Sequence, residues 1–121
     1  MYHKDMEAWK KSIELVTKVY KLTKTFPDDE KFGLISQMRR AAVSIPSNIA
    51  EGAARNSDKD MLRFLDISLG SVAELETQII IAENLQYMQD TDIYDDIKVT
   101  TALISGMKKY LNNKTEYMKS D

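Results

Sequence analysis

The sequence predicts an all-α fold, with residues 1–121 forming a single domain that is an antiparallel up-down four-helix bundle. Apolar residues recur at intervals of three and four along four long stretches, which is the period of an amphipathic helix. Short polar connections separate these stretches, as in bundles whose successive helices run antiparallel. No stretch of strand length alternates between apolar and polar residues, and 121 residues suit a single domain.

The first helix is expected from about Glu7 to Thr25. Its apolar residues form two adjoining stripes, which together make the broad apolar face of a bundle helix. Asp5 is expected to be its N-cap, because a side-chain oxygen there can accept a hydrogen bond from a free amide of the first turn. Pro27 is expected to end the helix, because proline disfavours helical geometry in the residue before it.

The second helix is expected from about Leu34 to Arg55 and combines a core face with a polar ribbon. On a wheel of 100° per residue, one arc is apolar and another is polar. The polar arc holds Gln37, Arg40, Ser44, Asn48, Glu51 and Arg55. Pro46 lies in the middle of the helix, where it removes a backbone donor and crowds the preceding turn, so we expect a kink near Pro46. The alternative is two helices, the second of them capped by Ser44.

The third helix is expected from about Asp58 to Gln86, and the fourth from about Thr91 to Lys114. Ser57 followed by Asp60 resembles a capping box, which marks the start of the third helix. Gly70 lies inside the third helix and forms a group of small residues with Ser68, Ser71 and Ala73. Because glycine has no side chain, another backbone could approach closely at this point.

The composition argues against catalysis and against bound metals. The chain has no cysteine and one histidine, so it cannot supply a thiolate site, a zinc site or a catalytic triad. It also lacks the Glu-x-x-His pairs of di-metal bundles and the glycine-rich loop that binds phosphate in nucleotide-binding proteins. We therefore predict that the protein is not an enzyme and binds no cofactor or metal.

Hydropathy and charge indicate a cytoplasmic protein without membrane contact. No apolar run approaches the roughly 20 residues of a membrane span, and the N-terminus lacks the apolar centre of a signal peptide. The net charge is −2, but it is unevenly distributed. Residues 1–63 hold 12 Lys and Arg against 9 Asp and Glu, whereas residues 64–121 hold 5 against 10. Such asymmetry permits a local basic patch.

Glu76 falls near the centre of the apolar arc predicted for the third helix. A buried carboxylate needs a partner, because an unpaired buried charge strongly destabilises the fold. If the second and third helices are antiparallel, Glu76 lies level with Gln37 and Arg40. We therefore predict a buried polar pair, Arg40–Glu76, assisted by Gln37. The pair either fixes the register of the helices or forms a subunit contact or ligand site.

Basic residues around the second helix and the start of the third form a candidate nucleic-acid-binding surface. The candidates are Arg39, Arg55, Lys59 and Arg63. Arginine can bind phosphate with two parallel hydrogen bonds, and clustered bases gain affinity by releasing counterions. The alternative is an ordinary solvated surface with scattered salt bridges, since Glu51, Asp58 and Asp60 interleave with these bases.

Two long segments of the chain resemble a known protein family. Gln37–Gly52 and Ile67–Gln78 are similar to a bacterial four-helix-bundle family whose members are encoded within intervening sequences of 23S rRNA genes. The resemblance extends over nearly the whole chain and departs from the family pattern at Gln86, where glycine is expected. It implies a homo-oligomeric ring, a pentamer, and no established enzymatic activity.

The same resemblance implies similarity to the accessory variability determinant of diversity-generating retroelements. That protein is a pentameric, basic partner of a reverse transcriptase and binds nucleic acid. The leading hypothesis for this chain is therefore a non-enzymatic oligomeric module that binds RNA or DNA through a basic surface of a ring. The alternative is a ring-shaped protein–protein scaffold with no nucleic-acid role.

Overall fold

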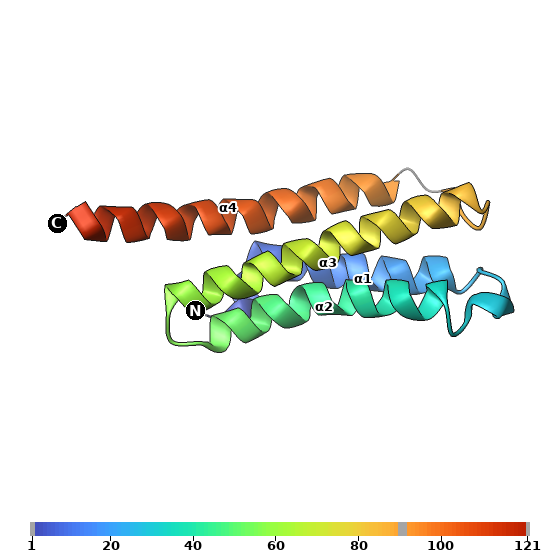
Figure 1. Cartoon of the computed structure of the whole chain (residues 1–121), viewed down its shortest axis with the longest axis horizontal. Coiled ribbons are helices and arrows are strands. Elements are labelled where there is room, and N and C mark those ends of the chain that lie inside the picture. Colours follow the sequence, from blue (N-terminus) through green and yellow to red (C-terminus); the bar gives the residue numbers. More distant parts are fainter. Residues whose placement is uncertain (1, 90–91, 121) are drawn as a thin grey trace.

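Four long helices form an antiparallel up-down bundle, which confirms the predicted fold class. The computed structural model describes residues 2–89 and 92–120, with side chains described as far as Lys114. The helices are α1 (Glu7–Thr23), α2 (Leu34–Ala54), α3 (Asp58–Asn84) and α4 (Asp92–Ser120), and two 3-10 turns, η1 (His3–Asp5) and η2 (Asp28–Glu30), precede α1 and α2. Successive helices run in opposite directions, and α4 extends past the other three at its C-terminal end (Figure 1). No strand occurs in the described ranges.

The first three helices begin at the predicted residues and end one or two residues earlier than predicted, and two other boundary predictions differ from the structure. Asp5 is not the N-cap of α1, because it belongs to the turn η1; Met6 occupies the cap position and offers no side-chain hydrogen bond. The C-terminal helix continues to Ser120, beyond the predicted end at Lys114, and its predicted start at Thr91 lies outside the described residues. The predicted cap of α3 is confirmed, since Ser57 Oγ accepts a hydrogen bond from the amide of Asp60 at 3.1 Å.

Pro46 lies inside an uninterrupted α2, so the alternative of two separate helices is wrong. The proline is buried and faces α1, where it lines a shallow pocket together with Trp9 and Ile13. Packing against α1 therefore stabilises the helical conformation of α2 around the proline. The kink near Pro46 stays a prediction.

Each helix buries one face in a shared apolar core. The largest fully buried side chains come from all four helices: Leu15, Met38, Ile45, Ile49, Leu65, Leu75, Ile79, Ile93, Ile104 and Leu111. Burying one such side chain stabilises a protein by roughly 1.5 to 3 kcal/mol relative to leaving it exposed. The periodic apolar pattern of the sequence therefore accounts for the bundle.

The most extensive contact in the bundle joins α2 to α3 through small residues. Ser68 Oγ donates to the carbonyl oxygen of Ile45 at 3.0 Å, and the hydroxyls of Ser44 and Ser71 are hydrogen-bonded at 2.9 Å. Near the α2–α3 turn the two backbones approach at Gly52, where a Cβ atom would lie only 2.9 Å from the Cβ of Phe64. The close approach expected along the small residues around Gly70 thus occurs at Ser68 and Ser71, and at Gly52 of α2, whereas Gly70 itself is exposed.

We predict that Gly52→Ala lowers the free energy of unfolding by about 1 to 3 kcal/mol, because the added methyl group overpacks the contact. Gly70→Ala is the matched control. Gly70 is exposed and no atom lies within 4 Å of its would-be Cβ, so alanine should raise the free energy by up to about 1 kcal/mol through helix propensity. Urea unfolding measures both effects. A Gly52→Ala protein as stable as the parent would contradict the close approach of α2 and α3.

A left-handed residue ends α3. Gln86 has a φ of 63°, a conformation that glycine adopts more readily than other residues. Its amide donates to the carbonyl of Glu83, and the amide of Tyr87 donates to the carbonyl of Ala82, which together form a Schellman motif. The motif explains why glycine is expected at this position.

Gln86→Gly should therefore raise the free energy of unfolding by up to about 1 kcal/mol. Glycine relieves the left-handed strain, although it also gives the unfolded chain more freedom. Asn84→Gly, two residues earlier in the last turn of the helix, should instead lose a few tenths of a kcal/mol. Thermal unfolding of the two variants compares them directly, and equal destabilisation by both would argue against strain at Gln86.

An ion-pair network joins α4 to α1. The two carboxylate oxygens of Asp96 each lie 2.9 Å from a lysine Nζ, one of Lys11 and the other of Lys18. The Asp96 side chain is 23% exposed, so the network is partly shielded from water. Burial by itself would raise the pKa of Asp96, but the hydrogen bonds from Lys11 and Lys18 outweigh it and lower the pKa below its ordinary value.

Asp96→Asn should lower the free energy of unfolding at neutral pH by about 1 to 2 kcal/mol, discounted for partial exposure. Because the pKa of Asp96 is lowered in the folded protein, its stabilising effect is present above the ordinary carboxyl pKa of 3.8 and is lost as pH falls through the folded value. The parent and the variant should therefore converge below pH 3.8. The exposed Asp95→Asn is the control, and a stability difference that does not change with pH would refute the role of the Asp96 charge.

Candidate nucleic-acid interface

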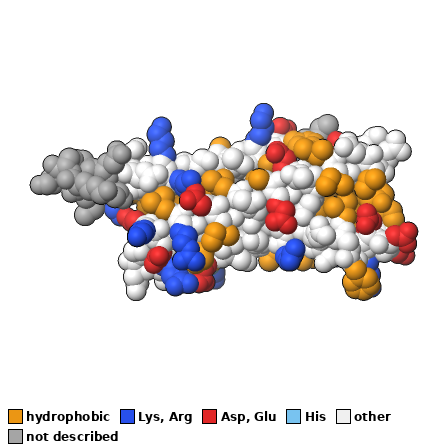
Figure 2. All heavy atoms as spheres, viewed as in Figure 1, with side chains coloured by type: hydrophobic (Ala, Val, Ile, Leu, Met, Phe, Trp, Pro, Cys, Tyr) orange, Lys and Arg blue, Asp and Glu red, His pale blue; other side chains and the backbone are white. Residues whose placement is uncertain are grey.

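Three of the four predicted basic residues lie together at the α2–α3 turn. Arg55 is the C-cap residue of α2, while Lys59 and Arg63 are exposed in the first two turns of α3. Figure 2 shows basic side chains gathered at this end of the molecule, with acidic ones between them. Arg39 lies 16 residues before Arg55 on α2, about 24 Å away at the rise of an α-helix. We call Arg55, Lys59 and Arg63 the turn cluster.

Phe64 organises the turn cluster. The guanidinium carbons of Arg55 and Arg63 each lie 5.2 Å from the centroid of its ring, within the range of a cation–π contact. Arg55 is also held by Glu51, whose carboxylate lies 2.7 Å from Nη2. One buried aromatic ring thus contacts the guanidinium groups of two exposed arginines.

Three acidic residues around the turn cluster form ion pairs. Besides Glu51, which binds Arg55, Asp58 pairs with Lys114 at 3.2 Å and Asp66 pairs with Lys108. Among the described residues, Lys59 and Arg63 form no ion pair. Of the three carboxylates expected to dilute the cluster, Asp58 is paired with Lys114, Glu51 binds Arg55 of the cluster itself, and Asp60 lies next to Lys59 in the first turn of α3.

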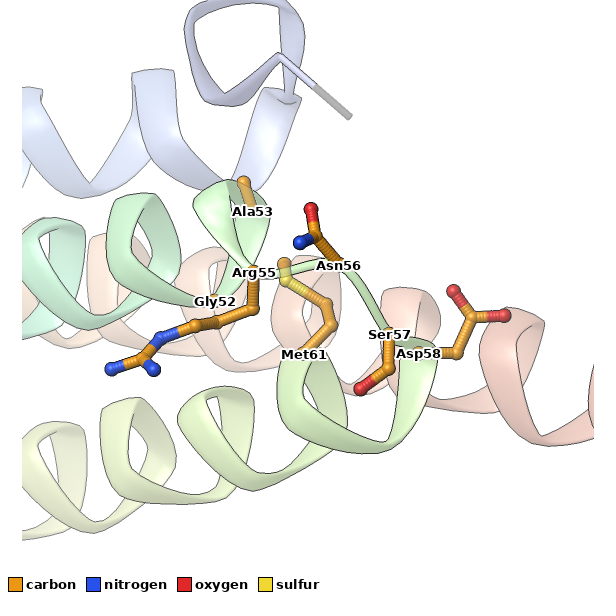
Figure 3. Close-up of a pocket in the computed structure, with 7 residues that line it drawn as sticks. All are labelled: Gly52, Ala53, Arg55, Asn56, Ser57, Asp58 and Met61. Carbon is orange, nitrogen blue, oxygen red and sulfur yellow. The ribbon is translucent and has the colours of Figure 1, made fainter.

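A small pocket of about 260 Å³ lies at the turn itself. Figure 3 shows that Arg55 and Asp58 point in opposite directions from it, with Met61 between the two chain segments. Asn56 and Ser57 complete the polar wall beside Asp58. Because the carboxylate of Asp58 lines one side, the pocket is poorly suited to binding phosphate. Of the turn cluster, Lys59 and Arg63 lie outside the pocket, on the neighbouring surface of α3.

The predicted buried pair is wrong. Gln37, Arg40 and Glu76 are all exposed, and no ion pair joins Arg40 to Glu76 within the described part of the chain. The prediction placed the core arc of α3 too far toward Leu62 and Leu69, which are only half buried. It is Leu75, one residue before Glu76, that faces the core.

Glu76 instead lies near α4. Burial, a hydrogen bond with Glu83 and the charges of Glu83 and Glu76 raise the pKa of Tyr94 to about 12. The register of α2 on α3 is set by the serine hydrogen bonds described above. Ser44 belongs to the polar arc predicted for the second helix, and Ser68 and Ser71 belong to the small residues around Gly70.

Arg39 joins α2 to α1 at the other end of the bundle. Its Nε donates to Thr23 Oγ1 at 2.9 Å, and its guanidinium carbon lies 4.5 Å from the centroid of the Tyr20 ring. Arg39 is therefore positioned by α1 and is separate from the turn cluster.

No group of three or more His, Asp or Glu residues within the described ranges is arranged to hold a metal ion. The helices, as far as they are described, also include none that is both long and apolar enough to cross a membrane.

Comparisons with known proteins agree with the resemblance seen in the sequence. The family model for the 23S rRNA-intervening sequence protein matches residues 4–112. No curated protein matches the chain. A crystal structure of a protein of unknown function from the S23 ribosomal protein family of Bacteroides thetaiotaomicron VPI-5482 superposes with a TM-score of 0.77 and 24% identity, covering 84% of this chain and 95% of that one. At this identity the superposition supports the fold alone.

Proposed function

Since the family model covers residues 4–112, the chain belongs to the 23S rRNA-intervening sequence protein family, and we propose that it is a non-enzymatic oligomeric module that binds RNA or DNA. By resemblance, its copies form a ring, a pentamer. Each copy contributes a basic surface, the turn cluster, to that ring.

The placement of two guanidinium groups against one ring, that of Phe64, is the observation that carries this proposal. Arg55 and Arg63 are thereby held at the surface with part of their conformational entropy already lost. Such groups bind phosphate oxygens bidentately at a lower ordering cost than free side chains do. Lys59 adds an exposed cation beside them.

A ring explains how a chain with a net charge of −2 can bind a polyanion. Every copy presents the same turn cluster, so weak sites act together along one strand. Linked sites raise the overall affinity by roughly 10² or more without any new contact.

A ring-shaped protein–protein scaffold is the second candidate. Three apolar side chains near the C-terminal end of α3, Ile80, Ile81 and Leu85, are 43 to 49% exposed, which suits contact with another protein surface. Figure 2 shows apolar side chains gathered toward that end of the molecule. This surface also serves the first candidate, in which copies of the chain contact one another.

We predict that the protein binds mixed-sequence RNA with an affinity that falls steeply as salt rises, because phosphate contacts release counterions. Arg55→Glu combined with Arg63→Glu should abolish binding without changing the assembly mass measured by light scattering, which should be several times 13.9 kDa. Lys10→Glu combined with Lys98→Glu makes the same change in net charge on exposed positions of α1 and α4 and should retain binding.

Each other outcome has a clear meaning. If the Arg55 and Arg63 reversal binds as well as the parent, the turn cluster is not the site. If the parent binds no nucleic acid at low salt, the scaffold takes the place of the first candidate. A monomeric mass at micromolar concentration would contradict both candidates.

A further inference from the structure

A third pocket, of about 510 Å³, lies between α1 and α2 beside the connection that joins them. This connection is at the opposite end of the bundle from the α2–α3 turn (Figure 1). Two aromatic residues and three cations line the pocket: Tyr20, Phe32, Lys31, Arg39 and Arg40. None of its lining residues is acidic. The pocket therefore favours a ligand that is both anionic and flat.

Phe32 is the most unusual residue of this pocket. Its side chain is 90% exposed, although aromatic residues generally gain much of their stabilising effect from burial. The ammonium of Lys31 lies 5.6 Å from the centroid of its ring. An exposed ring beside a cation offers a face on which a planar, negatively charged ligand can stack.

Arg39 provides a second flat surface. Its guanidinium lies over the Tyr20 ring, and it donates hydrogen bonds to Thr23 Oγ1 and to the Tyr20 carbonyl oxygen, the latter at 3.4 Å. These bonds use two of the five donors of a guanidinium. The group is therefore held in place by α1 and still has donors for a ligand.

The acidic residues closest in sequence do not fill the pocket. Glu30, directly before Lys31, accepts a hydrogen bond from the Tyr87 hydroxyl near the end of α3. Asp28 and Asp29 are exposed in η2 and are not among the lining residues. The three cations thus face the pocket without an acidic partner in its wall.

We propose that this pocket binds an unpaired nucleobase of single-stranded RNA or DNA. The Phe32 ring and the Arg39 plane stack against the base, and Lys31 and Arg40 attract the adjoining phosphates. Stacking on aromatic rings and guanidinium planes is the way in which proteins hold unstacked bases, and it tolerates any sequence. This inference rests on the proposed function and adds to it a preference for single strands.

The first test compares single-stranded with double-stranded RNA of the same length. Phe32→Ala should weaken binding of the single strand about tenfold, leave duplex binding unchanged and leave the salt dependence unchanged, since no charge is removed. Tyr110→Ala, which removes another exposed aromatic ring on α4, is the matched control and should have no effect. Because Phe32 is almost fully exposed, its replacement leaves the fold intact.

The second test places a reporter at the site. In Phe32→Trp, polyuridylate should quench the added fluorescence by stacking, with the parent protein as the blank for Trp9. Polyglutamate, an anion without bases, should not quench it. Equal quenching by polyglutamate would overturn the proposal, because the pocket would then only attract anions.

The two proposals can fail separately. If Phe32→Ala has no effect on the single strand while the Arg55 and Arg63 reversal abolishes binding, the stacking site is wrong and the proposed function stands. If neither form of RNA binds the parent at low salt and polyuridylate does not quench the reporter, both are wrong.

Discussion

The close approach of α2 to α3 is the constraint on which the rest of the structure depends. Small residues allow it: the hydroxyls of Ser44, Ser68 and Ser71 bond across the contact, and Gly52 leaves room beside Phe64. Buried hydroxyls with partners fix one register, since any slip would leave them unsatisfied. This register also fixes the position of the α2–α3 turn and of the side chains that the turn carries.

Both candidate binding surfaces follow from this geometry because they lie at the two ends of α2. At one end Phe64, packed beside Gly52, supports Arg55 and Arg63. At the other end α1 holds Arg39 through Thr23. The middle of the polar ribbon is partly satisfied within the chain, because Asn48 donates to Ser44 at 2.9 Å. The ribbon therefore has its cationic groups toward its ends and hydrogen-bonded polar groups between them.

The success and failure of the site predictions have the same physical origin. Arg55, Lys59 and Arg63 lie together because they are neighbours along the chain near one turn. Arg39 is 16 positions before Arg55, about 24 Å away along a helix, and is therefore separate from the turn cluster. The error over Glu76 came from a displacement of the wheel by one residue, which moves a side chain by about 100°.

The sequence by itself determined the number of helices, where the first three begin and, apart from the displaced face of α3, which face of a helix is apolar, because these depend on local periodicity and on caps such as Ser57. It also carried the resemblance that the family match confirms. Only the tertiary structure decided which side chains meet. Phe64 contacts two arginines, Asp96 pairs with a lysine of α1, and Arg39 lies over Tyr20. Each of these contacts depends on how the elements pack against one another. Periodicity says which face of a helix is buried, but the rotation and register of neighbouring helices, set by packing of the whole bundle, decide the partner of each residue.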